Sequence, residues 1–177
     1  MAEEAFGEFR KSSPLTGHFE KDFNLNTTWY PNYIDGFEGA LQGIAIKWDK
    51  CNFTKEAIVN VPDSFGVYCF TADIGGPFPD GSKIQVLYIG KASDQHLSER
   101  YDDYLGEINS TKGRVKVVSI LRKYKPSLVF WWCELAPIHV EVVERHLLMC
   151  YEPPANDQFP KKDKHWGKAF TQSQSEE

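Results

Sequence analysis

Residues 65–71 read FGVYCFT, and residues 84–91 read IQVLYIGK. Both stretches are rich in β-branched and aromatic residues, which favour extended strands. Between them, residues 75–81 read GGPFPDG, and glycine and proline both interrupt regular structure. The pattern therefore predicts two antiparallel strands, at 65–71 and 84–89, joined by a long hairpin loop.

The residues after this hairpin alternate between helical and strand patterns. The expected elements are, in order, a helix at 94–105, a helix at 112–125, a strand at 128–135 and a helix at 137–151. Ser93 or Asp94 can cap the first helix, and Gly106 follows it as a stop signal. The segment 112–125 also has a strand-like valine pattern, but its later apolar spacing favours a helix. The expected strand, LVFWWCEL, is an apolar run typical of a strand buried on both faces.

Composition divides the 177 residues into three parts. Residues 1–60 carry many aromatic side chains without a sustained period, which predicts an ordered extension packed on the core. Residues 61–160 are expected to form the main domain, and residues 161–177 form a tail that is first basic and then acidic. The expected fold is α/β in the broad sense (α+β), with a small, mainly antiparallel, three-stranded sheet flanked by helices.

The overall composition excludes several classes of protein. A hydrophobic content of 41% and an aromatic content of 14% indicate a globular chain rather than a disordered one. No apolar stretch approaches the roughly 20 residues that span a bilayer, and the acidic N-terminus lacks a secretory pattern. The expected location is therefore the cytoplasm, without membrane partners. The four cysteines form no CxxC pair, so we expect thiols packed as small apolar groups.

Polar side chains occupy positions where helical spacing predicts apolar ones. Arg100 shares a helical face with Leu97 and Tyr104, and Glu144 shares one with Leu147. A buried carboxylate without a partner is costly, so it becomes neutral or binds a cation. Two interpretations of Glu144 remain open at this stage: a ligand of a divalent metal ion, or an ion pair with Arg100 that joins two helices.

Taken in order, these residues resemble the GIY-YIG nuclease family, metal-dependent enzymes that hydrolyse phosphodiester bonds. The two tripeptides that name the family appear as residues 66–68 (GVY) and 88–90 (YIG), with Val67 in place of isoleucine. The further positions that match the family are Lys91, Arg100, Tyr104, Glu144 and Asn156. The resemblance covers about residues 65–157. The chain departs from the family in its longer hairpin loop and in two extra residues between Lys91 and Arg100.

The resemblance implies a role for each of these residues. Tyr68 is expected to act as general base, and Tyr88 to orient the attacking water or the phosphate. Glu144 is expected to hold Mg²⁺ or Mn²⁺, because Mg²⁺ needs only one or two protein carboxylates beside water and phosphate oxygens. The expected phosphate contacts are Lys91, Arg100 and Tyr104. The expected structural supports are Gly66, Gly90 and Asn156, the last by bonding to backbone.

The expected partner is DNA, although the net charge of −5 argues mildly against it. Charge distribution matters more than the sum, and basic residues gather in the middle of the chain. The candidate nucleic-acid contacts are Lys112, Arg114, Lys116, Arg122 and Lys123. A solvated surface is the alternative interpretation. The leading hypothesis is a DNA endonuclease of restriction type, and the alternatives are a repair or mobile-element nuclease, a non-catalytic nucleic-acid-binding module and an unrelated globular protein.

Overall fold

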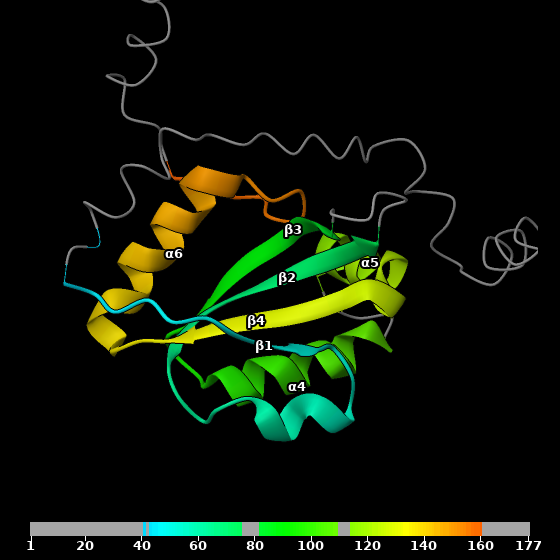
Figure 1. Ribbon diagram of the computed structural model, residues 1–177, viewed down its shortest axis with the longest axis horizontal. Coiled ribbons are helices and arrows are strands. Elements are labelled where there is room, and N and C mark those ends of the chain that lie inside the picture. The colour runs from blue at the N-terminus through cyan, green and yellow to red at the C-terminus, as the bar shows by residue number, and fades with distance from the viewer. Residues whose placement is uncertain (1–40, 42, 76–81, 110–113, 161–177) are drawn as a thin grey trace, which may run out of the picture.

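Four antiparallel strands form the centre of the fold in the computed structural model (Figure 1). The structure describes residues 41, 43–75, 82–109 and 114–160. The strands are β1 (Asp49–Asn52), β2 (Gly66–Gly75), β3 (Ser82–Ala92) and β4 (Leu128–Glu134). Their order across the sheet is β1-β4-β2-β3, so β3 forms one edge. The mixed α+β class is confirmed, but the described sheet has four strands where three were expected.

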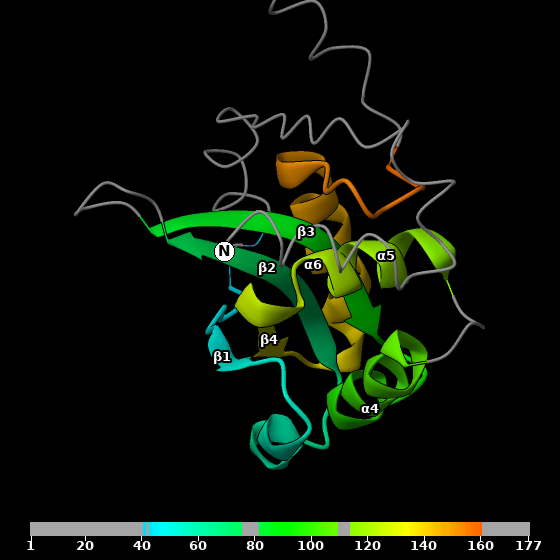
Figure 2. The ribbon, with the colours of Figure 1, turned by 90° about the vertical axis from the view of Figure 1, so that its right-hand side faces the viewer.

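Three α-helices cover the two faces of this sheet (Figures 1 and 2). They are α4 (Leu97–Ile108), α5 (Val115–Lys123) and α6 (Pro137–Tyr151), and two short 3₁₀ helices are η1 (Glu56–Asn60) and η2 (Lys125–Ser127). Side chains of α4 and α5 pack on one face, and side chains of α6 pack on the other. The fold is therefore a sheet between two helical layers, and each expected helix is present.

The fourth strand comes from the segment that we expected to be an extension. β1 pairs with β4, Asp49 lying opposite Trp132, and Phe53 just after β1 is 6% exposed in the core. The sequence of β1, DKCN, is too short and too polar to show the alternation that marks a strand. The last part of residues 1–60 thus belongs to the sheet. Residues 1–40 and the tail at 161–177 lie outside the described residues.

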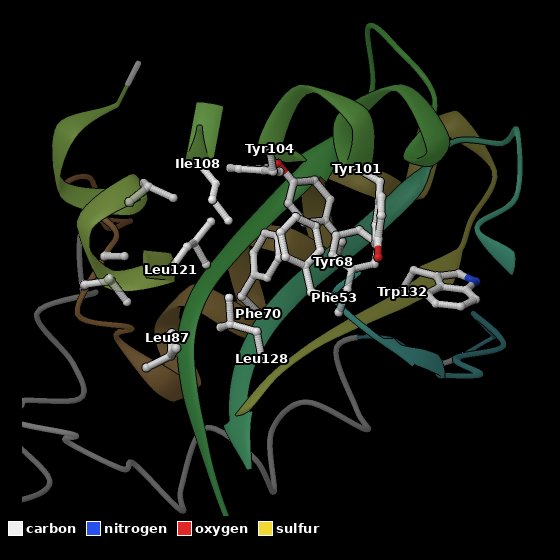
Figure 3. Close-up of a cluster of buried hydrophobic side chains, with 14 of the residues drawn as sticks. Phe53, Tyr68, Phe70, Leu87, Tyr101, Tyr104, Ile108, Leu121, Leu128 and Trp132 are labelled. Atoms are coloured by element: carbon white, nitrogen blue, oxygen red, sulfur yellow. Dashed lines mark hydrogen bonds between the residues drawn. The ribbon is translucent and has the colours of Figure 1, made fainter. Parts of the chain in front are cut away.

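Aromatic rings fill the core between the sheet and helices α4 and α5 (Figure 3). Phe70 and Phe130 come from neighbouring strands, with ring centroids 5.2 Å apart. Tyr104 of α4 meets Phe70 at 4.9 Å, and Tyr101 meets Phe130 at 5.0 Å, both in edge-to-face geometry. Edge-to-face pairs of this kind stabilise a core beyond the area that they bury. This aromatic layer holds α4 against the sheet.

The opposite face of the sheet packs against α6 through aliphatic side chains. Val67 and Ile89 from the hairpin contact a cluster that includes Val140, Val143 and Leu147 of α6. Side chains alternate between faces along a strand, so residues 67 and 68 of β2 face different helical layers. The GVY and YIG tripeptides therefore contribute to both cores at once.

Two glycines are required where β2 meets its neighbours. A Cβ at Gly90 would lie 2.5 Å from the ring of Tyr68, which faces it across the hairpin. A Cβ at Gly66 would lie 2.1 Å from the backbone oxygen of Cys133 on β4. Real Cβ atoms do not approach other atoms this closely. The expected structural role of both glycines has a steric cause, which is close approach of a ring in one case and of a strand in the other.

The helix α4 begins and ends later than the sequence pattern predicted. His96 precedes it, and the His96 backbone N–H donates to Glu99 Oε2 at 2.7 Å, as in a capping box. Ser93 and Asp94 were therefore wrong as caps, because β3 continues to residue 92 and the chain needs a turn before the helix. Gly106 was wrong as a stop, since it lies inside the helix.

Two further expectations concern the cysteines and the presence of a membrane-spanning segment. All four cysteines are free thiols, and Cys133 and Cys150 are buried. Within the described part of the chain, no helix is both long enough and apolar enough to cross a membrane.

The close approach at Gly90 predicts a large difference between two glycine substitutions. Gly90→Ala should lower the free energy of unfolding by about 1–3 kcal/mol, because the new methyl group must displace the buried Tyr68 ring. Gly106→Ala is the matched control. It has no atom within 4 Å of its Cβ and lies in a helix, so it should gain about 0.5–1 kcal/mol. Urea unfolding measures both. Equal stability of Gly90→Ala and wild type would contradict the contact.

Candidate active site

An open groove of about 1150 Å³ lies beside the edge strand β3. We call it the β3 groove. Its lining comprises Tyr88, Lys91, Arg114, Val115, Lys116, Val117, Glu141, Glu144, Arg145, Leu148 and residues 155–160. Four residues that the sequence singled out for the site therefore share one cavity: Tyr88, Lys91, Glu144 and Asn156. Tyr68, Arg100 and Tyr104 are not part of this lining.

The groove collects side chains from both faces of the sheet. Tyr88 pairs with Phe70 across the hairpin and leans on the aromatic core under α4. Lys91 pairs with Val67, whose side chain belongs to the α6 side. Directly opposed residues in an antiparallel pair point to the same face, so Tyr88 and Lys91 point to different faces. They can line one cavity only because it lies at the edge of the sheet.

An irregularity in β3 adjusts the position of Tyr88. The pairing runs from Phe70–Tyr88 directly to Thr71–Val86, so Leu87 is an extra residue in β3. A bulge of this kind increases the local twist and re-aims neighbouring side chains. Here both Leu87 and Tyr88 pack toward the aromatic core. The bulge thus places the Tyr88 ring at the border between core and groove.

Asn156 binds the backbone of the YIG segment. Its Oδ1 accepts a hydrogen bond from Ile89 N–H at 3.0 Å, and its Nδ2 donates to Ile89 C=O at 2.8 Å. Ala155 N–H donates to Leu87 C=O at 3.0 Å beside it. These bonds satisfy backbone groups on the free edge of β3 that would otherwise lack partners. The bonding to backbone that the sequence analysis expected of Asn156 is present.

Lys91 lies between two carboxylates of α6. Its Nζ is 3.1 Å from Glu144 Oε2 and 2.9 Å from Glu141 Oε2. The Glu144 side chain is only 18% exposed, whereas that of Glu141 is 80% exposed. The ion pair of Glu144 is thus with Lys91, and the alternative of a pair with Arg100 is wrong. Glu141 was missed as a groove residue, although it lies one turn before Glu144 on the same helix.

The two carboxylates differ in how the protein affects their protonation. Burial raises the pKa of Glu144 above its usual value, and the attraction of Lys91 offsets this only in part. The pKa of Glu141 is lowered, chiefly by its hydrogen bond to Lys91. The pKa of Lys91 is raised, with the Glu141 hydrogen bond as the largest cause. A carboxylate whose pKa stays raised by burial, even beside a lysine, is typical of functional sites.

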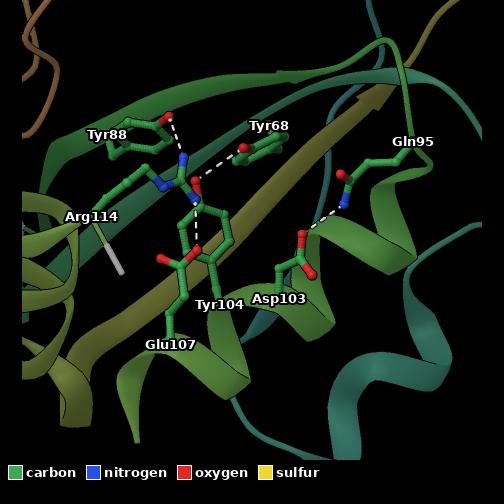
Figure 4. A network of polar contacts seen from close by, with 7 residues as sticks. All are labelled: Tyr68, Tyr88, Gln95, Asp103, Tyr104, Glu107 and Arg114. Atoms are coloured by element: carbon green, nitrogen blue, oxygen red, sulfur yellow. Dashed lines mark hydrogen bonds and ion pairs between the residues drawn. The ribbon is translucent and has the colours of Figure 1, made fainter. Parts of the chain in front are cut away.

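Three tyrosines and one arginine form a network on the other side of the groove (Figure 4). The hydroxyls of Tyr68 and Tyr104 are 3.0 Å apart. Arg114 Nη1 donates to Tyr88 Oη at 3.2 Å, and Arg114 Nη2 lies 3.5 Å from Glu107 Oε1. The guanidinium also lies over the ring of Tyr104, 4.6 Å from its centroid. Arg114 was expected only as a DNA contact, and no local spacing indicated that it would join the tyrosines.

The position of Tyr68 argues against its expected role as general base. Its side chain is 1% exposed, and its hydroxyl is bonded to Tyr104, which is itself fully buried. Burial raises the pKa of Tyr68 well above that of an ordinary phenol, and the positive charges of Arg100 and Arg114 reduce this shift only slightly. The phenolate that a general base needs is therefore disfavoured. Tyr88 is the tyrosine of the set that lines the groove.

Arg100 of α4 is not part of the β3 groove lining. Its positive charge lowers the pKa of Tyr68 slightly. The Nε atom of Arg100 is buried and has no hydrogen-bond partner within the described residues. A buried donor of this kind is costly, and an anionic ligand is one way to satisfy it. Arg100 thus keeps the capacity for a phosphate contact that the sequence suggested.

The basic residues of the middle segment do not form one free surface. Lys116 Nζ binds Asp157 Oδ1 at 2.6 Å, and Arg122 Nε donates to Ile108 C=O at 2.7 Å. Lys123 lies over the ring of Tyr124, and Lys112 lies outside the described residues. Of the expected DNA contacts, only Arg114 and Lys116 line the β3 groove. Lys91 and the exposed Arg145 add two further cations to it.

The donor atoms of the groove suit a hard divalent cation. No group of three His, Cys, Asp or Glu side chains gathers among the described residues, so a complete protein cage is absent there. Glu144 and Glu141 nevertheless bring carboxylate oxygens to one point, where both bind Lys91 Nζ. One or two carboxylates are sufficient for Mg²⁺ when water and phosphate oxygens supply the remaining ligands. Glu144 therefore fits the role of metal ligand that the family resemblance implied.

Comparison with known proteins does not assign this chain to a family. No family model matches it, and no curated protein or solved structure matches it significantly.

The opposite pKa shifts of the two glutamates predict opposite effects on stability. The folded pKa of Glu144 is raised, so its stabilising contribution is present below about 4.5, its ordinary value, and is lost as the pH rises. Glu144→Gln should therefore become more stable than wild type as the pH increases from 4.5 to 7. Urea unfolding across this pH range measures the difference.

Glu141→Gln is the matched control for that experiment. The folded pKa of Glu141 is lowered, so wild type gains stability above its ordinary value and loses it on acidification. Glu141→Gln should be slightly less stable than wild type at pH 7, with the difference vanishing at low pH. A loss of stability at pH 7 in Glu144→Gln as well would instead assign Glu144 to a purely structural ion pair with Lys91.

Proposed function

We propose that this protein is a divalent-metal-dependent endonuclease that hydrolyses DNA phosphodiester bonds, of the GIY-YIG type. The observation that carries the proposal is the place of Glu144. It is a partly buried carboxylate with a raised pKa, and it lies in an open groove whose lining also includes Tyr88, Lys91 and Lys116. A carboxylate for a metal ion, cations for a phosphate and a hydroxyl for a water molecule are the groups that this reaction needs.

In this proposal Glu144 holds Mg²⁺, or Mn²⁺ in its place. A divalent ion bound there would supply positive charge to the scissile phosphate and its leaving oxygen. Lys91, which contacts Glu144 in the structure, is a flexible point charge on the same groove wall. If Glu144 held such an ion, the Lys91 ammonium group would be available to bind a phosphate oxygen. The Lys91–Glu144 pair thus keeps both groups in place between reactions.

The substrate is held by three cations of the groove, Lys91, Lys116 and Arg145. The local distribution of charge matters more for DNA than the acidic net charge of the whole chain. The expected phosphate contact of Arg100 is supported by its buried Nε donor, which has no hydrogen-bond partner among the described residues. Tyr104 supports the groove wall through its hydrogen bond to Tyr68.

Tyr88 orients the attacking water in this proposal. It is the tyrosine of the expected pair that lines the groove, and Arg114 binds its hydroxyl at 3.2 Å. Gly90 and Asn156 set the position of the strand that carries it, the first by admitting the Tyr68 ring and the second by bonding Ile89. A restriction-type enzyme is favoured within this class by the segments that flank the core. A repair or mobile-element nuclease is the alternative.

The first test is plasmid nicking with and without Mg²⁺. Wild type should nick only with the metal ion, and Glu144→Gln should lose about 10²–10³-fold or more in rate, since a lost metal contact removes several kcal/mol of transition-state stabilisation. Glu141→Gln is the matched control, because it changes an exposed carboxylate on the same lysine. It should keep most of the rate. Metal-independent binding of DNA without any nicking would favour the non-catalytic binding module.

The burial of Tyr68 predicts unequal effects of two tyrosine substitutions. Tyr88→Phe should lower the single-turnover rate by about 10–100-fold, because misplacing a reacting group has effects of this size. Tyr68→Phe removes a hydroxyl that is bonded to Tyr104 and hidden from the groove, so its rate should stay near that of wild type. Both changes keep the aromatic ring. A greater loss in Tyr68→Phe would restore that residue as the general base.

A further inference from the structure

Arg114 contacts three protein side chains, although it was expected only as a DNA contact. It immediately precedes α5, and its guanidinium reaches across to β3 and α4 (Figure 4). One nitrogen donates to Tyr88 Oη at 3.2 Å, and the other lies 3.5 Å from Glu107 Oε1. The Cζ atom of the group lies 4.6 Å from the centroid of the Tyr104 ring. Three side chains from two elements, β3 and α4, therefore hold one guanidinium.

These contacts fix the orientation of the Arg114 guanidinium as well as its place. The group is planar and its five N–H donors point in set directions, so two bonds and one ring contact leave it little freedom. Glu107 attracts it from one end, and its Oε2 atom is buried without a hydrogen-bond partner among the described residues. The Tyr104 ring face adds a cation–π attraction. A guanidinium with a fixed orientation can in turn fix the side chain to which it donates a hydrogen bond.

The side chain that Arg114 holds is Tyr88. Tyr88 sits beside the extra residue Leu87 of β3, at the border between the aromatic core and the groove. The Arg114 bond is the hydrogen bond that the structure describes for the Tyr88 hydroxyl. Other groove cations have different partners: Lys116 binds Asp157, and Lys91 binds the two glutamates of α6. Within the described groove, Arg114 is thus the cation that determines where this hydroxyl points.

We propose that Arg114 is a positioning residue that fixes the Tyr88 hydroxyl in the β3 groove, with Glu107 and Tyr104 holding the guanidinium in place. This inference rests on the proposed function for its catalytic consequence. It differs from the role of a DNA contact, because Arg114 acts through Tyr88 and not through the phosphate backbone. It also differs from a packing role, because Arg114 determines the orientation of one hydroxyl and not the stability of the fold.

The first experiment does not require activity. Protein labelled with [¹³Cζ]tyrosine contains eight tyrosine signals, and Tyr88→Phe identifies that of Tyr88. In Arg114→Gln, the Tyr88 signal should move, and the Tyr104 signal should move with it through the lost ring contact. Arg114→Lys should also move the Tyr88 signal, since an ammonium group cannot bind Tyr88 and Glu107 in the same two-pronged way. Arg114→Lys keeps the positive charge, so it provides the test if Arg114→Gln does not fold. An unchanged Tyr88 signal in the folded variants would overturn the proposal.

A control for the labelling experiment lies at the other end of the same helix. Lys123 contacts the ring of Tyr124 with its Nζ 5.5 Å from the centroid. Lys123→Gln should move the Tyr124 signal and leave that of Tyr88 in place. A shift of Tyr88 in this variant would show that changes in α5 reach the tyrosine generally, and it would overturn a specific role for Arg114.

The second experiment tests the catalytic consequence in a double-mutant cycle. Arg114→Gln and Tyr88→Phe should each reduce the single-turnover rate of Mg²⁺-dependent cleavage by about 10–100-fold. The double variant should be no slower than the slower single variant, because both changes remove the same placed hydroxyl. Lys116→Gln is the matched control, a groove cation without contact to Tyr88, and its effect should multiply with that of Tyr88→Phe. If the losses of Arg114→Gln and Tyr88→Phe multiply in the double variant, the positioning role is overturned.

DNA affinity separates positioning from a phosphate contact. Binding of a 30-base-pair duplex, measured in EDTA at several salt concentrations, should show the same salt dependence for Arg114→Gln and wild type. A direct phosphate contact would instead reduce the slope of log affinity against log salt by about one, which would overturn the proposal. If wild type does not cleave DNA at all, the proposed function fails. The tyrosine signals still decide whether Arg114 positions Tyr88.

Discussion

The close contact between the Tyr68 ring and Gly90 is the constraint on which the rest of the site depends. The ring occupies the space that any Cβ at residue 90 would need, so β2 and β3 can pair in this register only around a glycine. This register sets Tyr88 opposite Phe70 and Lys91 opposite Val67. From it follows which face of the sheet each side chain takes. The hairpin thus decides the places of a tyrosine and a lysine through one steric contact.

The candidate site is assembled at an edge because its parts belong to different faces of the sheet. Tyr88 and Arg114 lie toward the aromatic layer, whereas Lys91 and Glu144 lie toward α6. A sheet interior would keep these two groups apart by the thickness of the backbone layer. At the edge strand they meet in one groove, and Asn156 binds the exposed backbone of β3 so that the edge stays closed to other strands.

Charge and burial divide the polar residues of the site into two kinds. Tyr68 and Tyr104 are bonded to each other and support the groove wall, and burial raises the pKa of both hydroxyls and so favours their neutral forms. Glu144 remains partly open and has a raised pKa despite its lysine partner. Keeping a partly buried carboxylate in its charged form costs free energy of folding. Carboxylates with pKa values perturbed in this way are often found where a ligand binds. The acidic net charge of the chain does not reflect the four cations of the groove.

The order and type of most elements could be predicted from the sequence, and so could Tyr88, Lys91, Glu144 and Asn156 of the groove. Strand and helix periods reflect local backbone geometry, so the hairpin, β4, α6 and an inward Glu144 were all predictable. The packing of the whole chain was needed to show that β1 adds a fourth strand, that Tyr68 is hidden, and that Lys91 rather than Arg100 binds Glu144. It also brought Arg114 to Tyr88 from 26 residues away. Burial and long-range contacts depend on how whole elements pack, and the local spacing of residues along the chain does not encode this packing.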